Sequence, residues 1–389
     1  LRLFLPSLDL AFYQDEIQRI VEQRAGMPMR IGRMQVALQG AHLVLQFHDV
    51  SMLDPKTGST RLHIRQAQTE VQLLDSIVQR GLVLGGAMVT GTSLRVIRRW
   101  DDTWVINGFR ESADARQGSV LGAFLRRTHL RVHDSDIYWL DEKTGQPPLH
   151  FSRVNVDLLN TADRHKLAAT AHLGEEASER IRVVADLQEG RENPFALSGQ
   201  VYLKTEAVEL AGRLGTTLTR GVQVDDGRLD LELWAELQGG KLNALQGRTK
   251  LHDLRLLAKN TPAFALERFS SEFDWLPKAQ GWRLNLDHLV VIQNRQLWPP
   301  GRLSIARRES PTGQVDLRLG ADYLGLHGLS QLLAMFSPAG SEWQQILTGL
   351  SPAGHLTRLR LAHSRDGVTA APRWRVSGSV THYHQQPWE

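Results

Sequence analysis

The chain has 389 residues, of which 41% are hydrophobic and 23% charged, so it can bury a large core and is unlike a disordered chain. Its formal net charge is only +4, and its lack of cysteine excludes disulfides, thiolate catalysis and thiolate zinc sites. No run reaches the ~18 apolar residues of a membrane-spanning helix. The chain begins at Leu1 rather than methionine, and removal of a membrane anchor would explain that start.

The first predicted element is a helix. Ser7 or Asp9 can cap its start, and apolar residues recur at helical spacing as far as Val21. Gly26 followed by Pro28 ends it. The sequence therefore predicts one helix over about 1–26 that leads into strands.

Short alternating runs follow the helix and predict hairpins. The runs 31–38 and 43–47 are separated by Gln39-Gly40, which is a turn signal. A degenerate repeat then aligns 53–64 with 140–151 without a gap, and each copy predicts a strand, a polar turn with glycine and a second strand. Its Lys-Thr-Gly triplet also occurs in penicillin-recognising serine enzymes, but the Ser-x-x-Lys nucleophile that this chemistry needs is missing. The repeat is therefore interpreted as a turn.

Between the two repeats the pattern is mixed. The sequence predicts short helices at 73–82 and 121–127, a polar mobile loop at 111–119, and strands at 94–96, 104–106 and 132–140.

The second half is more regular. From Gly227 to Gly240, Leu229, Leu231 and Leu233 alternate with mostly polar residues, which is typical of a strand with one dry face. Similar strands are predicted at 166–173, 180–188, 196–204, 228–238, 245–257, 267–275, 282–292, 302–307, 314–319 and 374–378. Leucine-rich helices are predicted near 326–336 and 341–350, and are interpreted as caps on a sheet end. The alternative is that they contact a membrane or plug a groove.

A search for catalytic chemistry finds no phosphate loop, no His-Glu-x-x-His and no nucleophile elbow. Asp134 with Asp136, and His382 with His384, share strand faces, and are interpreted as a solvated face and an incidental pair rather than as a carboxylate pair or a metal site. Trp100, Trp104 and Trp139 favour packing over the stacking of sugars or bases. We therefore expect no enzyme, no cofactor, no metal and no nucleic-acid partner.

The long series of strands leaves one question, which is what covers the dry face. A sandwich covers it with a second sheet, a barrel closes on itself, and an open trough exposes it to acyl chains. The residues expected to line such a trough, or otherwise an ordinary core, are Val36, Leu38, Leu43, Leu45, Phe47, Leu62, Ile64, Leu94, Val96, Ile181, Val183, Leu229, Leu231, Leu233, Leu284 and Leu286.

Several segments, in order and spacing, carry a resemblance to a known family. They are Leu5-Pro6 with Leu8-Asp9, Gly26-Met27-Pro28, His48-Asp49-Val50, Phe124-Leu125-Arg126 with Asp134-Ser135, Arg164-His165, Trp298-Pro299 with Gly301, and Ala321 to Pro338. From its start to about residue 360 the chain resembles the AsmA-like family and, within it, the YhdP branch of large envelope proteins. The chain would then be the N-terminal portion of a longer protein.

This resemblance implies a fold similar to the chorein-type bridge proteins. It implies a mainly β fold with an N-terminal helix (1–26), a chorein-like part of a hydrophobic groove (27–170), and a continuing groove of curved antiparallel sheet (171–389) with a helical insert at about 324–350. It also implies a periplasmic protein anchored in the inner membrane that carries phospholipid to the outer membrane, with an envelope or outer-membrane protein as a possible partner. An envelope scaffold or outer-membrane assembly factor without lipid cargo, and a carbohydrate-binding β protein, remain the alternatives.

Overall fold

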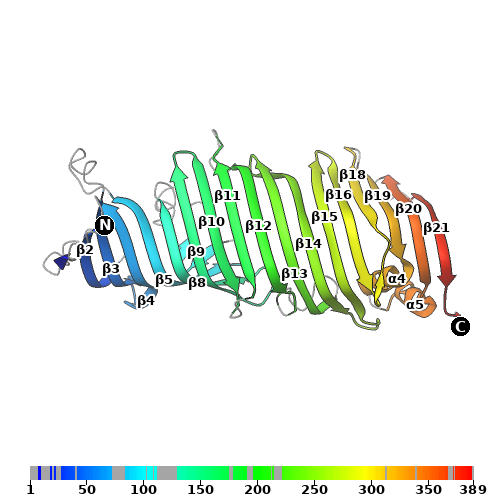
Figure 1. The fold of residues 1–389 in the computed structure, drawn as a ribbon, viewed down its shortest axis with the longest axis horizontal. Coiled ribbons are helices and arrows are strands. Elements are labelled where there is room, and N and C mark those ends of the chain that lie inside the picture. Colours follow the sequence, from blue (N-terminus) through cyan, green and yellow to red (C-terminus); the bar gives the residue numbers. More distant parts are fainter. Residues whose placement is uncertain are drawn as a thin grey trace. The chain divides into compact units, whose positions relative to one another are not determined.

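The computed structural model is mainly β, with the helices α4 (Leu326–Phe336) and α5 (Glu342–Leu350) near its C-terminal end (Figure 1). It describes residues 8–9, 18–19, 22, 28–39, 42–71, 84–101, 103–107, 109–111, 129–174, 178–190, 196–211, 213, 221–311, 313–337, 340–366, 371 and 373–387. Gln18, Arg19 and Glu22 are helical, but Leu8 and Asp9 pair with Val36 and Gln35 as a short strand, so the prediction of a helix is wrong at these two residues. The other residues predicted for the N-terminal helix lie outside the described residues. The helices predicted at 73–82 and 121–127, and nearly all of the loop predicted at 111–119, also lie outside them.

The chain divides into two compact units, Leu1–Glu189 and Gly190–Glu389. The division near residue 170, which the sequence suggests for the two parts of the groove, stays a prediction. The strands of the first unit are β1 (Leu8–Asp9), β2 (Met29–Gln39), β3 (His42–Leu53), β4 (Thr60–Val71), β5 (Leu84–Arg98), β6 (Trp104–Ile106), β7 (Phe109–Glu111), β8 (Leu130–Asp141), β9 (Leu149–Thr161), β10 (Arg164–Leu173) and β11 (Arg180–Gln188).

Strands of the first unit that follow one another in the chain pair antiparallel, except that β8 pairs with β5 instead of with β7. The predicted β2–β3 hairpin is present, and β3–β4 and β8–β9 form the hairpins predicted from the repeat. β5 and β8, however, run parallel, so the expectation of a wholly antiparallel sheet is wrong at this point. Parallel neighbours need a long connection, and the chain between β5 and β8 is long enough to contain the small β6–β7 hairpin.

The turns of the two repeats are built alike. Gly58 and Gly145 both have a positive φ, of 68° and 63°, which glycine adopts without a steric penalty. The Asp54 carboxylate accepts hydrogen bonds from the backbone N–H groups of Lys56 (2.7 Å) and Thr57 (3.0 Å). In the second copy the Asp141 carboxylate accepts one from the backbone N–H of Lys143 (3.0 Å).

The Asp54 turn predicts a pH-dependent contribution to stability. Hydrogen bonds from the Thr57 and Lys56 backbones, and then the Arg61 guanidinium, lower the pKa of Asp54 from 3.8 to about 2. Because the folded-state pKa is the lower one, the stabilisation is present above pH 4 and is lost as the pH falls towards 2. We expect Asp54→Asn to lower the melting temperature at pH 7, and the difference from the wild type to shrink between pH 4 and 2. A difference that stays constant over this range would contradict the assignment.

The second unit is a meander in which each long strand pairs antiparallel with the next long strand of the chain. Its strands are β12 (Ser198–Glu209), β13 (Gln223–Gln238), β14 (Lys241–Leu257), β15 (Phe264–Lys278), β16 (Gly281–Gln293), the short β17 (Gln296–Leu297), β18 (Gly301–Glu309), β19 (Gln314–Gly325), β20 (Ala353–Asp366) and β21 (Arg373–His384). All strands predicted between 196 and 319, and both helices, are confirmed. β12 and β21 do not pair with each other among the described strands, so this sheet is open.

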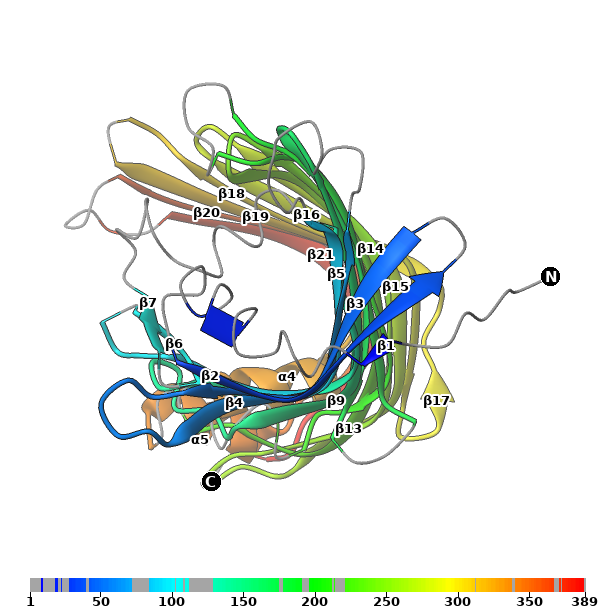
Figure 2. The same ribbon diagram turned by 90° about the vertical axis from the view of Figure 1, so that its left-hand side faces the viewer.

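Many long strands contain one residue in the left-handed region, which bends the strand. In the second unit Ala207, Asp253, His288 and Arg358 have φ values between 51° and 53°. Such residues interrupt the regular pleat and redirect the side chains that follow. Figure 2 shows the strands of this unit bending along their length, with α4 on the inner side of the curve.

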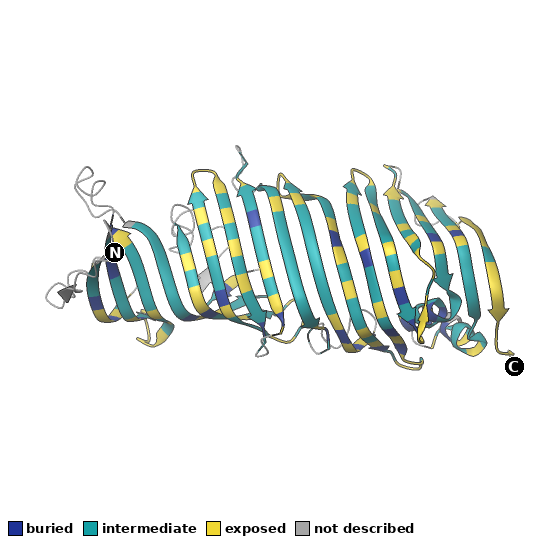
Figure 3. Cartoon of the chain, viewed as in Figure 1, coloured by how far each residue is buried: buried dark blue, intermediate teal, exposed yellow. Residues whose placement is uncertain are grey.

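The solvent-accessible surface is too large for compact globules. The chain exposes 25053 Å², whereas a compact monomer of its 43.7 kDa mass would expose about 15,000 Å². Even two separate globules of half that mass would expose only about 18,500 Å² together. Figure 3 agrees, because most strand residues are half-buried or exposed and few are fully buried. The sheets therefore keep much of their surface open.

Candidate functional site

One face of the second unit's sheet carries two unbroken rows of directly opposed, almost entirely apolar residues. Paired residues of adjacent strands lie on the same face, so the strand register defines each row. The first row is Val201, Ala235, Leu245, Trp275, Leu284, Ile305, Leu319, Leu361 and Val376. The second row is Leu203, Leu233, Gly247, Phe273, Leu286, Leu303, Ala321 and Leu359. We call these rows the apolar face of the second unit.

The first row crosses every long strand from β12 to β21. Neighbouring strands lie about 4.8 Å apart, so it extends about 38 Å across eight strand intervals. Its residues are half-buried, except Val376, which is 63% exposed. At Gly247 the second row stays continuous because Phe273 lies over it, and a Cβ at Gly247 would come within 2.8 Å of the Phe273 ring.

Helix α4 covers this face at one end only. Its Met335, which is 2% exposed, belongs to a core cluster with Val224, Leu256 and Phe264. Leu229, Leu251 and Phe269, which pair across β13, β14 and β15, pack partly buried against the same cluster. These three lie on the same side of their strands as the apolar face, so α4 lies on that side too.

This placement of α4 over one end of the apolar face fits both the interpretation as a cap and the alternative that the helix plugs a groove, so the choice between them stays a prediction. Helix α4 packs against β15, β19 and β20, and α5 packs against α4. Among the described elements no second sheet packs on the apolar face, so beyond the reach of α4 these rows are open.

Helix α4 is expected to contribute to stability. Met335→Ala should lower the free energy of unfolding by about 2–5 kcal/mol, because it removes a buried side chain and leaves a cavity. Leu333→Ala is the matched control on the same helix, since Leu333 is 51% exposed, and should change stability by less than about 0.5 kcal/mol. Chemical denaturation of both variants checks this, and equal effects would show that α4 does not seat Met335 in a core.

The first unit carries a similar apolar face. One row is Met34, Phe47, Ala67, Val89, Val132, Val156, Ala169 and Val183. The next row is Val36, Leu45, Thr69, Ala87, Leu130, Leu158, Leu167 and Ala185. Eight strands at about 4.8 Å spacing give each row a length of about 34 Å. Met34, Leu45 and Ala185 are buried, and the other residues of the two rows are half-buried.

Residues with a left-handed backbone conformation explain why the apolar residues of a single strand have odd numbers in one part and even numbers in another. In β14, Leu251 and Leu254 lie on either side of Asp253, whose φ is 53°, and both pack against the α4 cluster. The alternation of apolar and polar residues is therefore shifted by one residue, and the apolar side chains stay on the same face of the sheet. In β5, Val89 and Leu94 lie on either side of Gly91, whose φ is 67°, so we infer that Leu94 continues the side of Val89.

The structure brings the predicted lining residues together in two groups, one in each unit. Val36, Leu43, Leu45 and Phe47 lie on one face of β3 and its neighbour β2, and Ile181 and Val183 lie at the β11 end of the same unit. Leu62, Ile64, Leu94 and Val96 lie beyond the bend of β4 and β5. Leu233, Leu284 and Leu286 lie in the rows of the apolar face of the second unit. Leu231 and Leu229 lie further along the same side of β13, Leu231 opposite Thr205 and Thr249 and Leu229 against the α4 cluster. Leu45 is buried, the Leu38 side chain lies outside the described residues, and the others are half-buried.

The candidate carboxylate pair has separate partners. Asp134 forms an ion pair with Arg65 (3.5 Å), and the Asp136 carboxylate lies 3.1 Å from the His150 ring. His382 packs its ring edge-on against His355. Trp104 and Trp139 pack against each other at 5.2 Å, while Trp100 is 70% exposed. Among the described residues, no group of three potential ligands could hold a metal ion, and no helix has the length and apolarity to cross a membrane.

The fold and the rows define a class of protein, namely a mainly β protein whose bent sheets leave long apolar faces open. Over residues 1–389 the chain matches the family described as YhdP protein, and it belongs to that family. Family membership implies a protein of the Gram-negative envelope and fits a lipid-transport role. No curated protein and no solved structure matches the chain.

Proposed function

We propose that this chain carries phospholipid acyl chains along its apolar faces, between the inner and the outer membrane of a Gram-negative cell. The observation that supports this most directly is the first row of the second unit, which crosses nine consecutive long strands without a polar side chain. Family membership agrees with the proposal. The location that goes with it is the periplasm, with attachment to the inner membrane.

The energetics favour an open face over a closed pocket. Each CH₂ group costs about 0.8 kcal/mol in water, so a 16-carbon chain costs roughly 13 kcal/mol. An apolar row that runs from strand to strand removes much of this cost at every position along it. The opposite face of the same strands is polar, with a network in which Arg248 lies 3.3 Å from Glu272 and His288 lies 3.2 Å from the same carboxylate. A lipid would therefore bind on one face only.

The proposed role does not include catalysis or a cofactor. An apolar row offers acyl chains contact without directed hydrogen bonds, so transport by it would depend on the chains and little on the head group. A scaffold or outer-membrane assembly factor would need no such row. A carbohydrate-binding protein would need an exposed aromatic platform instead.

Binding of a fluorescent phospholipid tests the proposal. The purified chain would be incubated with vesicles that contain the labelled lipid and then separated from them by size-exclusion chromatography. We expect fluorescence to elute with the protein, and unlabelled phospholipids with different head groups to displace it with similar potency. A folded protein that elutes without fluorescence would favour the assembly-factor alternative.

A further inference from the structure

A second feature lies on the opposite, polar face of the second unit, over β16, β18, β19, β20 and β21. One cross-strand row there is Arg283, Ala306, Arg318, Ala362 and Arg375, so that arginine and alanine alternate. Strands two apart lie about 10 Å from each other, so the three arginines are spaced by about that distance. Arg360 lies in the adjacent row, opposite Gly320 and Ser377.

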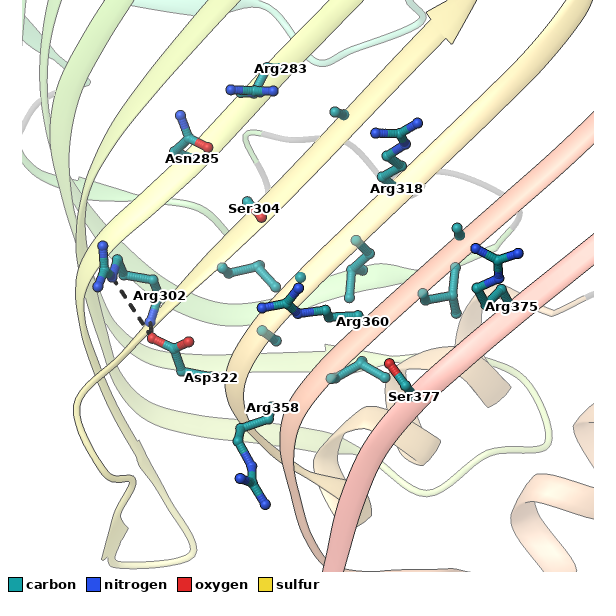
Figure 4. A pocket seen from close by; sticks show the side chains of 18 of the residues that line it. Arg283, Asn285, Arg302, Ser304, Arg318, Asp322, Arg358, Arg360, Arg375 and Ser377 are labelled. Carbon is teal, nitrogen blue, oxygen red and sulfur yellow. Dashed lines mark hydrogen bonds and ion pairs between the residues drawn. The ribbon is translucent and has the colours of Figure 1, made fainter.

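These four arginines line a hollow with a floor of small residues. The hollow has a volume of 890 Å³, and Ser304, Ala306, Gly320 and Ala362 are among the residues that line it. Figure 4 shows Arg283, Arg318, Arg360 and Arg375 around it. Large side chains in the intervening positions would fill this space, so the alternation of arginine with alanine produces the hollow.

The four arginines have no carboxylate partner among the described residues, in contrast to the arginines of β13 and β14. At the lower end of the hollow, Arg302 lies 3.9 Å from Asp322 and 4.0 Å from Asp287. Arg358 donates a hydrogen bond to the Ser379 hydroxyl (3.1 Å). All four arginines are exposed, so their charge is available to a ligand.

On β13 and β14, each arginine of the same face has an acidic partner. Arg228 lies 2.9 Å from Asp253, Arg248 lies 3.3 Å from Glu272, and Arg255 lies 3.3 Å from Asp225. The arginines of this face are therefore paired with acidic residues over β13 and β14, whereas the four arginines of the hollow are not. Uncompensated guanidinium groups around a hollow favour an anion that can accept paired hydrogen bonds.

We propose that this hollow binds a ligand that carries at least two phosphate groups. Phosphate matches the planar fork of the guanidinium group and can carry two negative charges, so two or three phosphates balance the four arginines. The volume is much larger than one phosphate needs, which favours a ligand with several. Two sources supply this chemistry, a free polyphosphate and the head groups of an anionic phospholipid surface. The site lies on the other face of the sheet from the apolar rows and does not rest on the proposed transport function.

Calorimetric titration with inorganic tripolyphosphate at low salt tests the site, in parallel with flotation on vesicles of phosphatidylcholine with and without phosphatidylglycerol. The test variant is Arg283→Gln/Arg318→Gln/Arg375→Gln. The matched control is Arg228→Gln/Arg248→Gln/Arg255→Gln, which removes the same charge from paired arginines on the same face. We expect the test variant to bind at least about tenfold more weakly and the control to stay within about twofold. Binding should weaken as salt is added.

The outcomes separate the possibilities. A selective loss of tripolyphosphate binding supports a free ligand, and a selective loss of binding to the anionic vesicles supports a phospholipid surface. Equal weakening of both variants would overturn the proposal, because net charge alone would then explain the binding. A wild-type chain that binds neither probe would also overturn it, and would favour an acidic protein as the ligand of the hollow. Leu231→Glu/Leu233→Glu, on the apolar face, should keep tripolyphosphate binding, so this test is independent of lipid transport.

Discussion

Replacing Leu231 and Leu233 together by glutamate is expected to reduce phospholipid binding and transfer by at least about tenfold while the protein stays folded. Leu233 lies in the second row between Leu203 and Gly247, and Leu231 lies two residues nearer the α4 end on the same side of β13. An acyl chain that passes two carboxylates must either desolvate them or leave the face. Either route costs more than the ~1.4 kcal/mol that corresponds to a tenfold change.

The fold should survive because both leucines are half-buried and solvent can reach the new carboxylates. The matched control is Gln238→Glu/Gln246→Glu, which adds the same two charges at exposed positions of β13 and β14. The control should retain transfer. Circular dichroism checks folding, and collapse of the leucine variant alone would show that these residues belong to a closed core.

Bound lipid should also protect one face of a strand from chemical labelling. The chain has no cysteine, so a single introduced cysteine gives an unambiguous signal. Leu284 lies in the first row, and Asn285 is its neighbour on the polar face, where its amide donates to Asp274 (2.9 Å). We expect Leu284→Cys to react with a maleimide at least about tenfold more slowly in lipid-loaded protein than after delipidation, because a dry contact excludes the reagent.

Asn285→Cys should react at the same rate in both preparations, since its side chain points away from the apolar face. Protection of both cysteines would indicate a general closing of the sheet rather than occupancy of one face. A Leu284→Cys chain that is labelled equally fast in both states would place the lipid elsewhere.

Much of the fold follows from alternation in the sequence. Leu229, Leu231 and Leu233 predict the dry side of β13 because a strand turns its side chains over at every residue. The repeat predicts both hairpins, because Asp54 and Asp141 start polar turns that Gly58 and Gly145 complete. The helices near 326–336 and 341–350 follow from leucines at helical spacing.

Long-range placement could not be predicted in the same way. The parallel β5–β8 pair depends on where the chain returns after residue 98, which no local pattern encodes. β20 was not predicted as a separate strand, since His355, His363 and several arginines dilute its alternation. Left-handed residues such as Asp253 shift the alternation, so Leu251 and Leu254 look unrelated in the sequence although both pack against one cluster.

The arginine hollow was missed for a related reason. Adjacent arginines are the more conspicuous pattern in the sequence, but Arg307 has Glu309 at 2.8 Å and Arg98 has Asp141 at 3.4 Å. The unpaired arginines lie on four different strands and are brought together only by strand register. A search for arginines that face alanines across predicted strand pairs would have found Arg283 and Arg318, which both face Ala306.

Mass spectrometry of organic extracts from the purified chain tests the central claim most directly, with a protein of similar size from the same expression host as the control. The account predicts phospholipid in near-stoichiometric or higher amounts in extracts of this chain and only traces in the control. A folded chain that yields no more lipid than the control would contradict it, and would mean that the apolar faces are covered by something other than lipid.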